Sequence, residues 1–313
     1  MSGPTVYVSL SQFCEHDDRP RRVLLEAGFH LLENRSGRRL RREEVAGAVG
    51  NADAVLAGLE PYDETILATL PRLRCISRCG IGTDAIDLAV ARERNVAVLT
   101  TIDEVAEPVA QMTVAMVLSL ARNFPVHIAE LHTGLWQRHT GHLLSEWTIG
   151  LVGYGRIGRT VERYLRPFGP RIVVADPRLG RDDIPEGVTL LGLYSLLAEA
   201  DLVSIHADRR PEEGPLIGRK ELEAMRVGSR LINTARGYLV DEGALYDSLQ
   251  SGRLAGAALD VFQEEPYGGP LAALPQVLCT PHIGSLTRAS RSAMELRCAE
   301  NVVNFFKGAK EAT

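Results

Sequence analysis

One glycine-rich stretch constrains the fold of this chain more than any other feature. Residues 148–158 read Thr-Ile-Gly-Leu-Val-Gly-Tyr-Gly-Arg-Ile-Gly, so a short apolar run meets three closely spaced glycines. An amphipathic segment follows, and then a second apolar run that ends in Asp176. This order of strand, tight turn, helix and acid-terminated strand is typical of a dinucleotide-binding βαβ unit. The stretch therefore predicts a parallel α/β fold that binds a dinucleotide.

Each residue type in this stretch has a physical reason. Gly153 allows the sharp turn, Gly155 lets a pyrophosphate approach the backbone, and Gly158 lets the helix pack closely. The free N–H groups at the helix N-terminus and its dipole favour the phosphates. Asp176 can accept hydrogen bonds from a ribose diol and would repel a 2′-phosphate, which favours NAD over NADP. The alternative is a glycine-rich turn in a different α/β fold.

Composition limits the other possibilities. The chain has 313 residues and a net charge of −5, which gives no basic surface for nucleic acid and suggests one large domain or two ordinary ones. The five cysteines include no Cys-x-x-Cys pair and indicate free thiols in a reducing compartment, so we expect a cytoplasmic protein. No signal pattern and no apolar run of membrane-spanning length is present, so neither secretion nor a membrane span is expected. His139 and His142 have no obvious third ligand beside them, and no metal is predicted.

The first hundred residues predict a separate α/β unit, because strand-like and helix-like segments alternate through them. The expected strands are Thr5–Val8, Phe29–Leu32, Asp53–Ala57, Arg74–Ser77 and Val96–Leu99, and the expected helices are Arg21–Ala27, Arg42–Val49, Asp63–Thr69 and Asp84–Arg94. A long apolar helix is expected at 101–123, between this unit and the dinucleotide unit. Residues 124–147 are polar, and we expect an irregular arm there.

One loop of the first unit, residues 77–84, reads Ser-Arg-Cys-Gly-Ile-Gly-Thr-Asp between a strand and a helix. Its glycines expose backbone N–H groups, and such a nest suits a carboxylate. Arg78 adds a positive charge beside it. The alternative is an ordinary strand–helix turn with a surface arginine.

Four polar residues follow predicted strands of the dinucleotide unit, which places them at the edge where ligands bind in open parallel sheets. They are His206, Arg236, Asp260 and His282, and Glu265 follows Asp260 by five residues.

These residue types suit hydride chemistry on an α-keto acid. Arg236 can clamp a carboxylate through its planar fork, and His282 can exchange a proton near neutral pH. Glu265 can hold the imidazole in one tautomer, and Asp260 can accept a hydrogen bond from a nicotinamide amide. For each residue taken alone, the alternative is an ordinary structural role. Arg236 could form a salt bridge, His282 could be a satisfied loop histidine, and Glu265 could be a solvated loop charge.

Four motifs together resemble those of the NAD-dependent D-isomer-specific 2-hydroxyacid dehydrogenases. They are the glycine stretch at 153–158, Asn-Thr-Ala-Arg-Gly at 233–237, Leu-Asp-Val-Phe-Gln-Glu-Glu-Pro at 259–266 and Thr-Pro-His-Ile-Gly at 280–284. The 77–84 loop and Pro-Val-Ala-Gln at 108–111 also match segments of the family, so the resemblance covers nearly the whole chain. Within the family the chain looks most similar to D-3-phosphoglycerate dehydrogenases without a regulatory domain.

The resemblance implies two doubly wound parallel-sheet domains, a Rossmann NAD-binding domain (100–285) inserted in a flavodoxin-like substrate domain (1–99 plus 286–313). It implies hydride transfer between NAD and C2 of a D-2-hydroxyacid, and a homodimer built on residues 100–147. The implied catalytic residues are Arg236, Glu265 and His282. The substrate would be held by Arg236 and by Arg78, Cys79, Gly80, Ile81 and Gly82. The cofactor would be held by Gly153, Tyr154, Gly155, Arg156, Ile157, Gly158, Asp176, His206, Thr234, Ala235 and Asp260.

Departures from the family pattern bear on the substrate. The segment after the predicted strand at 202–205 reads His-Ala-Asp-Arg-Arg where the family commonly has His-x-Pro-Leu-Thr. Arg209 and Arg210, together with Arg78, suggest an anionic tail on the substrate, such as a phosphate or phosphonate. Glu265 argues against formate oxidation, since formate-oxidising relatives have glutamine there. A dinucleotide-sensing corepressor or scaffold with the same fold stays open, because such proteins can retain the catalytic triplet.

Overall fold

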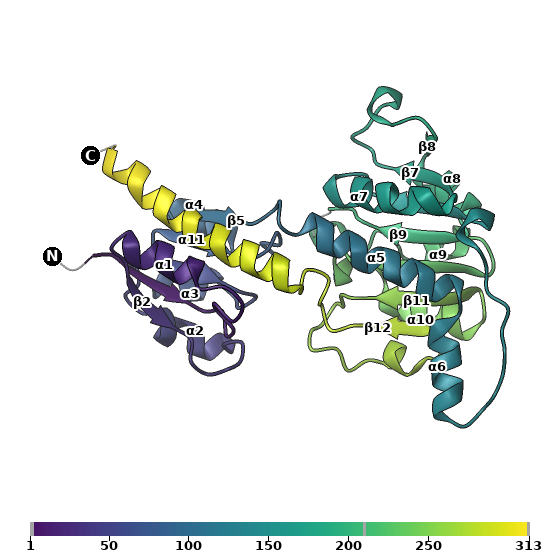
Figure 1. Cartoon of the computed structure of the whole chain (residues 1–313), viewed down its shortest axis with the longest axis horizontal. Helices are drawn as coiled ribbons and strands as arrows, with labels where there is room; N and C mark the ends of the chain where they lie inside the picture. The colour runs from purple at the N-terminus through teal and green to yellow at the C-terminus, as the bar shows by residue number, and fades with distance from the viewer. Residues whose placement is uncertain (1–2, 209–210, 312–313) are drawn as a thin grey trace. The chain divides into compact units, whose positions relative to one another are not determined.

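The computed structural model describes residues 3–208 and 211–311, and the chain divides into two compact units. Unit 1 comprises Met1–Val105 and Ser285–Thr313, and unit 2 comprises Ala106–Gly284. Each unit is a parallel sheet with helices on both faces (Figure 1). One continuous segment thus forms unit 2, while unit 1 is built from both ends of the chain.

Unit 1 contains a five-stranded parallel sheet in the order β2-β1-β3-β4-β5, the flavodoxin-like order. Its strands are β1 (Thr5–Val8), β2 (His30–Glu33), β3 (Ala54–Ala57), β4 (Cys75–Arg78) and β5 (Ala97–Thr100). The central strands β3 and β4 are buried along their whole length, whereas the edge strand β2 alternates exposed and half-buried residues. This is the pattern expected when helices cover both faces of a parallel sheet.

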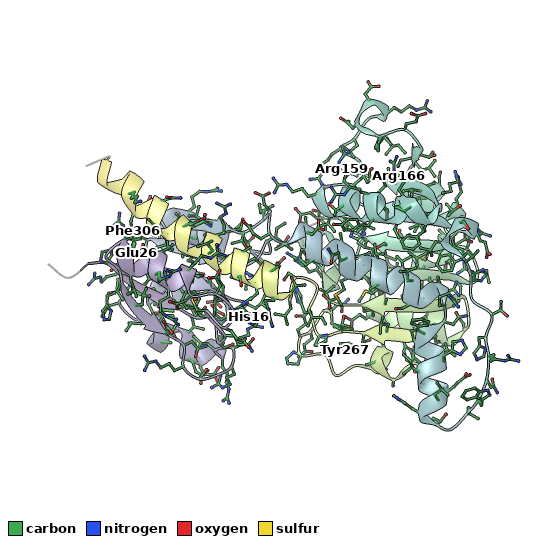
Figure 2. All side chains as sticks on the ribbon, viewed as in Figure 1. His16, Glu26, Arg159, Arg166, Tyr267 and Phe306 are labelled. Atoms are coloured by element: carbon green, nitrogen blue, oxygen red, sulfur yellow. The ribbon has the colours of Figure 1, made fainter. Side chains whose placement is uncertain are left out.

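Helices of unit 1 cover the two faces of its sheet. Helices α2, α3 and α4 contribute Val45, Ile66 and Ala91 to one buried apolar cluster. On the other face α11 packs against α1 and β4. The bounds of these helices are α1 (Arg19–Glu26), α2 (Arg42–Val49), α3 (Glu64–Ala68), α4 (Leu88–Glu93) and α11 (Arg288–Glu311). Phe306, labelled on α11 in Figure 2, packs edge-on against Phe29 with ring centroids 5.4 Å apart.

Unit 2 contains a seven-stranded parallel sheet in the order β12-β11-β10-β9-β6-β7-β8. The order reverses at β6, which places the glycine turn after β6 at the switch point where ligands bind in such sheets. The strands are β6 (Thr148–Val152), β7 (Arg171–Ala175), β8 (Val188–Leu190), β9 (Leu202–Ile205), β10 (Ser229–Asn233), β11 (Leu254–Leu259) and β12 (Val277–Cys279). Both parallel sheets confirm the predicted fold class.

Helices α5 and α7 lie side by side on one face of the unit 2 sheet, and α8, α9 and α10 cover the other (Figure 1). The helices of unit 2 are α5 (Ala106–Ala121), α6 (Phe124–His132), α7 (Arg156–Leu165), α8 (Leu193–Glu199), α9 (Arg219–Ala224) and α10 (Glu242–Gln250). Short 3₁₀ turns occur at Leu144–Glu146, Arg166–Phe168, Arg181–Asp183, Pro211–Glu213, Gly237–Leu239 and Pro270–Ala273.

Two features of unit 2 bear on the sequence prediction. The segment 124–147 is not irregular throughout, because its first nine residues form α6. Among the described residues no single helix is long and apolar enough to span a membrane. Helices α5 and α6 taken together have the length and composition of such a span, but they are bent by 66° relative to each other. Half of α5 is buried in the core of unit 2, which is where an apolar helix of this kind is expected.

Candidate active site

The carboxyl ends of three adjacent strands carry the residues expected to do chemistry. Arg236 follows β10, Glu265 lies in the loop after β11, and His282 follows β12. These strands are neighbours in the sheet, so their following loops emerge at the same edge.

Two features hold the Arg236 loop in place. The side-chain amide of Asn233 donates to the carbonyl oxygen of Arg236 (2.8 Å), and its oxygen accepts from the Ala235 amide (3.0 Å). A Cβ on Gly237 would overlap the backbone of Phe262 and Gln263. Only glycine therefore allows the Arg236 loop to pack directly against the loop that carries Glu265.

Thr234, predicted to bind the cofactor, is buried and has a partner that sequence reasoning missed. Its hydroxyl lies 3.1 Å from the hydroxyl of Thr113, which stands in the middle of α5. The sequence signal for this contact is a polar residue, Thr113, within a largely apolar helix.

Asp260 organises the His282 loop. Its side chain is 1 % exposed. One carboxylate oxygen accepts from the Thr280 hydroxyl (2.6 Å) and the Ile283 amide (2.8 Å), and the other accepts from the Gly284 amide (2.8 Å). A carboxylate offers about four acceptor positions, so three are used here. The sequence named Asp260 for a nicotinamide amide, but its observed partners all belong to the segment that carries His282.

His282 and Glu265 form a direct pair. The imidazole Nδ1 lies 3.1 and 2.9 Å from the two carboxylate oxygens of Glu265. A carboxylate can only accept, so Nδ1 carries the proton of this contact and Nε2 points elsewhere. No described residue hydrogen-bonds Nε2. The backbone of His282 is left-handed (φ 55°), a conformation that costs about 1–3 kcal/mol and that the Asp260 contacts hold in place.

The Glu265 side chain is held by hydrogen bonds, although residues 263–266 of its loop are exposed. The Phe262 amide donates to a Glu265 carboxylate oxygen at 3.2 Å. The rings of Phe262 and Tyr267 stack at 4.1 Å, and the Glu265–Pro266 peptide bond is cis. Tyr267 is labelled in Figure 2. The Phe262 amide and the His282 imidazole thus both contact the Glu265 carboxylate.

The turn between β6 and α7 has the form the glycine pattern predicted. Gly153 has φ 91°, and a Cβ there would lie 2.6 Å from the His206 carbonyl group and the Ala207 amide. A Cβ on Gly158 would overlap the Gly153 carbonyl oxygen. A Cβ added at Gly155 would have no described atom within 4 Å, and no described side chain caps the N-terminus of α7. The N-terminus of α7 is therefore an open cradle that fits a pyrophosphate.

Of the other residues in the glycine stretch, Tyr154 and Ile157 contribute side chains to the core of unit 2. The Tyr154 side chain is 1 % exposed and lies below the guanidinium of Arg159, 4.5 Å from its ring centroid. The Tyr154 amide donates to Asp176 (3.0 Å). Ile157 packs against the core below α7, and Arg156 is exposed at the start of that helix.

Asp176 directly follows β7 and is a buried, ionised group. Burial acts to raise its pKa, but hydrogen bonds from the amides of Tyr154 and Arg178, together with the Arg178 guanidinium, outweigh burial and lower the pKa below its usual value. The Arg178 amide donates to it at 3.0 Å. A negative charge at this strand end suits a ribose diol and opposes a 2′-phosphate.

His206 follows β9, beside the glycine turn, and its Nε2 lies 2.9 Å from the Ser204 hydroxyl. Burial lowers the pKa of His206 to about 4, so the ring is neutral at pH 7.

Acidification should destabilise unit 2 through His206. The unfolded ring binds its proton near pH 6.5 and the folded ring only near pH 4, so the stability is present above pH 6.5 and lost as the pH falls towards 4. Between pH 7 and pH 5 we expect a loss of about 1–2 kcal/mol. His206→Gln keeps a hydrogen-bonding side chain beside Ser204 and should reduce this loss, measured as the thermal midpoint without cofactor at both pH values. Equal pH sensitivity in both proteins would contradict the assignment.

The predicted carboxylate nest lies in unit 1, after β4. The Gly80 amide is already used, because it donates to the Thr101 hydroxyl at 2.8 Å. Arg78 is buried rather than a surface arginine, and its guanidinium donates to the Cys79 carbonyl oxygen and lies against Gly80. No described residue accepts a hydrogen bond from the Ile81 or Gly82 amide. The free donors of the nest are therefore those of Ile81 and Gly82.

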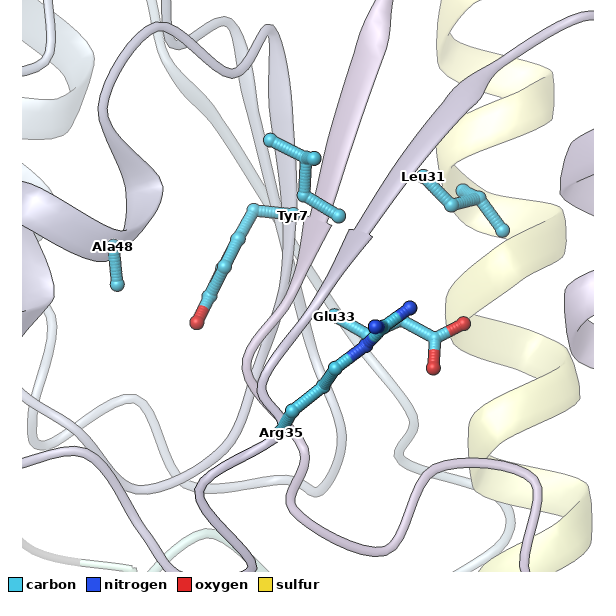
Figure 3. A pocket seen from close by; sticks show the side chains of 6 residues that line it. Tyr7, Leu31, Glu33, Arg35 and Ala48 are labelled. Carbon is cyan, nitrogen blue, oxygen red and sulfur yellow. The ribbon is translucent and has the colours of Figure 1, made fainter.

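The remaining candidate residues lie elsewhere. Arg209 and Arg210 are outside the described residues. His139 pairs with Glu130 (2.8 Å) and His142 with Glu146 (3.1 Å), and within residues 3–208 and 211–311 no group of three metal-ligating side chains occurs. A surface pocket of about 460 Å³ in unit 1 (Figure 3) is lined by Tyr7, Leu31, Leu32, Glu33, Arg35 and Ala48, none of which the sequence predicted as site residues.

Comparison with known proteins identifies the family. Residues 114–284 match the family model described as "D-isomer specific 2-hydroxyacid dehydrogenase, NAD binding domain". This segment includes the glycine turn, Asp176, Arg236, Glu265 and His282, and its last residue is Gly284, which donates to Asp260.

Relatives and solved structures agree with this match. The chain is 35% identical to the D-3-phosphoglycerate dehydrogenase of Mycobacterium tuberculosis over 266 residues, which are 83% of this chain and 50% of that protein. It therefore spans about half the length of the phosphoglycerate dehydrogenases it matches. It is 34% identical to the glyoxylate reductase of Thermococcus litoralis over 80% of this chain and 78% of that one.

The crystal structure of the TT0316 protein from Thermus thermophilus superimposes with a TM-score of 0.87 and 34% identity, covering 97% of both chains. The similarity thus extends over both units and beyond the NAD-binding domain. The chain belongs to the D-isomer specific 2-hydroxyacid dehydrogenase family.

Proposed function

We propose that this protein transfers hydride between NAD(H) and C2 of a D-2-hydroxyacid or the corresponding 2-keto acid. The observation that carries the proposal is the Glu265–His282 pair, with Nδ1 and carboxylate 2.9 Å apart, on the loops that follow β11 and β12. Through Gly237, the loop that carries Arg236 packs against the loop that presents Glu265. In this proposal, His282 is the proton donor and Arg236 is the carboxylate clamp, both on loops at one edge of the unit 2 sheet.

Bound NADH supplies the hydride, and the chain supplies binding and the proton. Arg236 holds the carboxylate of the 2-keto acid with its planar fork and polarises the adjacent carbonyl. His282, protonated at both nitrogens, gives its Nε2 proton to the developing alkoxide oxygen. Glu265 keeps Nδ1 protonated and stabilises the charged imidazole before the transfer. In unit 1, the amides of Ile81 and Gly82 form a carboxylate-binding nest in this proposal.

The test of the proposed function is turnover. NADH oxidation is followed by absorbance with a panel of 2-keto acids that includes glyoxylate, pyruvate, 3-phosphohydroxypyruvate and phosphonopyruvate. Turnover with at least one 2-keto acid supports the proposal. Tight NADH binding without turnover of any of them contradicts it and favours the dinucleotide-sensing corepressor or scaffold.

A phosphate or phosphonate tail on the substrate is the finer part of the proposal. It is supported by the relatives named D-3-phosphoglycerate dehydrogenase, among them that of Methanocaldococcus jannaschii, 34% identical over 86% of this chain. A preference for 3-phosphohydroxypyruvate or phosphonopyruvate over glyoxylate and pyruvate in kcat/KM is the expected result. A preference for glyoxylate would reject the phosphate or phosphonate tail but would not contradict the proposed hydride transfer.

Asp176 should set the choice between NAD and NADP. Asp176→Ala removes the charge that opposes a 2′-phosphate and leaves the Arg178 guanidinium without its carboxylate partner. We expect the ratio of kcat/KM for NADH over NADPH to fall by at least about tenfold. Because Asp176 also accepts the Tyr154 amide, thermal stability is measured as a control. An unchanged cofactor ratio would reject the ribose-diol role.

We also propose a homodimer that uses α6 and the segment after it. Phe124, Ile128 and Leu131 repeat at helical spacing on α6 and are all about half exposed, and Trp136 is 84% exposed. An apolar surface of this kind is typical of a protein–protein interface. Size-exclusion chromatography with light scattering should give a dimer, and Ile128→Glu with Leu131→Glu should shift it to monomer. Val227→Glu, at an apolar residue 76% exposed between α9 and β10, is the matched control and should stay dimeric.

A further inference from the structure

A strongly basic segment leads from β2 into α2 in unit 1. Residues 35–42 include five arginines and no acidic residue. Two of these arginines are paired with carboxylates. Arg38 contacts both carboxylate oxygens of Glu44 (2.8 and 2.6 Å), and Arg42 pairs with Asp63. The charges of Arg38 and Arg42 are therefore largely compensated within unit 1.

Arg39 differs from these two arginines in its partner. Its guanidinium donates to the backbone carbonyl oxygen of Leu59, in the loop that follows β3. Within residues 3–208 and 211–311 no carboxylate forms an ion pair with Arg39, and the residue is exposed. A carbonyl group is neutral, so it orients the guanidinium without cancelling its charge. Because a guanidinium has five N–H donors, most of them stay available for a ligand.

The loop that holds Arg39 is the neighbour of the loop that carries the nest. Strands β3 and β4 are paired in parallel, so their carboxyl ends meet at one edge of the sheet. The pairing continues past the strands, because the Cys79 amide donates to the Ala57 carbonyl oxygen (2.9 Å). Neighbouring strands lie about 4.8 Å apart, and Leu59 is only the second residue after β3. The contact with Leu59 thus keeps the Arg39 guanidinium at the same edge of unit 1 as the nest at 80–82.

The carboxylate of the same loop is turned into unit 1. Glu60 is 2% exposed. Its Oε1 accepts from the Gly58 amide (2.8 Å), the Tyr62 hydroxyl (3.2 Å) and the Ser9 hydroxyl. These neutral donors hold the Glu60 charge below the surface, whereas Arg39 is exposed. The charge that this loop presents to an approaching ligand is therefore the positive charge of Arg39.

We propose that Arg39 is a specificity-determining residue that binds the phosphate tail of a substrate whose carboxylate lies in the nest. The planar fork of a guanidinium can donate two parallel hydrogen bonds to phosphate oxygens. The sequence suggested Arg78, Arg209 and Arg210 for this tail, but Arg78 is buried against Gly80 and the other two lie outside the described residues. The role of the nest rests on the proposed function, whereas binding of the phosphate to Arg39 requires no hydride transfer.

Two acids that differ only by the phosphate test the proposal directly. The full-length protein with saturating NADH, which cannot react with a hydroxyacid, is titrated calorimetrically with 3-phosphoglycerate and with D-glycerate. The unaltered protein should bind 3-phosphoglycerate more tightly. Arg39→Gln should weaken that binding by about tenfold and change the binding of D-glycerate by less than about twofold. Equal affinity of the unaltered protein for the two acids, or an equal loss for both acids in Arg39→Gln, overturns the proposal.

Two further variants separate the guanidinium of Arg39 from the general charge of the segment. Arg38→Gln is the matched control, because Arg38 lies next to Arg39 but is paired with Glu44, and the affinity for 3-phosphoglycerate should be unchanged. Arg39→Lys keeps the charge without the fork and should bind with intermediate affinity. The thermal midpoint without ligand shows that each variant is folded. An equal loss in Arg38→Gln and Arg39→Gln would assign the effect to net charge and reject the specific role of Arg39.

Kinetics distinguish this proposal from the proposed function. The ratio of kcat/KM for 3-phosphohydroxypyruvate over hydroxypyruvate should fall by about tenfold in Arg39→Gln, through KM and with kcat for hydroxypyruvate unchanged. An unchanged ratio overturns the role of Arg39 and leaves the proposed hydride transfer standing. If no 2-keto acid is turned over, the proposed function fails, while the titrations still decide whether Arg39 binds the phosphate.

Discussion

Replacement of His282 by alanine is expected to lower kcat for 2-keto acid reduction by about 10²–10⁴-fold, because the alkoxide loses its proton donor. The dissociation constant for NADH should change by less than about twofold, since the glycine turn and Asp176 are untouched. Stopped-flow turnover and fluorescence titration with NADH measure the two quantities. An equal loss of NADH binding and turnover would contradict the assignment of His282.

The chain provides a matched control for this variant. His142 also places Nδ1 against a carboxylate, 3.1 Å from Glu146, but lies outside the sheet edge. His142→Ala should leave kcat unchanged. Glu265→Gln keeps the shape of the His282 partner but removes its charge, so kcat should fall less than in His282→Ala.

Replacement of Arg236 by alanine should lower kcat/KM for the 2-keto acid by about 10²–10³-fold, because both the carboxylate clamp and the polarising charge are lost. Arg236→Lys should recover only part of the loss, since an ammonium group cannot form two parallel hydrogen bonds. The steady-state constants for substrate are measured at saturating NADH, together with the NADH dissociation constant.

The control for Arg236 is an exposed arginine on the same unit. Arg219 at the start of α9 pairs with Asp247 (2.7 Å) at the surface, and Arg219→Ala should leave kcat/KM unchanged. If Arg236→Ala reduced the affinity for NADH as much as it reduced turnover, the residue would serve the fold or the cofactor rather than the substrate.

The sequence could predict both parallel sheets because their central strands are short apolar runs bounded by turns. The five strands predicted for unit 1 each lie within one residue of the observed ones, for example Arg74–Ser77 against Cys75–Arg78. Strand β8 was missed, since three residues at a sheet edge carry almost no periodicity. Helix α6 was missed because its apolar residues face outward among polar neighbours.

For the candidate site, the sequence could name residues and the pairing of Glu265 with His282, but not the contacts that hold their loops. Chemistry and position after strands were enough to select Arg236, Glu265 and His282. Asp260 accepts three hydrogen bonds from the His282 loop across 20 to 24 residues of chain, which no local pattern encodes. The same holds for Gly80, whose amide is taken by Thr101 across two neighbouring strands.

The sequence by itself determined the fold class, the dinucleotide turn and the types of chemically useful residues, because glycine conformation, strand hydrophobicity and side-chain chemistry are local properties. The tertiary structure alone decided which amides of the 78–82 loop stay free, that Asp260 holds the His282 loop, and that the Cys298 thiol contacts the Ser77 carbonyl oxygen more than two hundred residues away in the chain. These are contacts between distant segments, and they exist only once the sheets and their covering helices have packed.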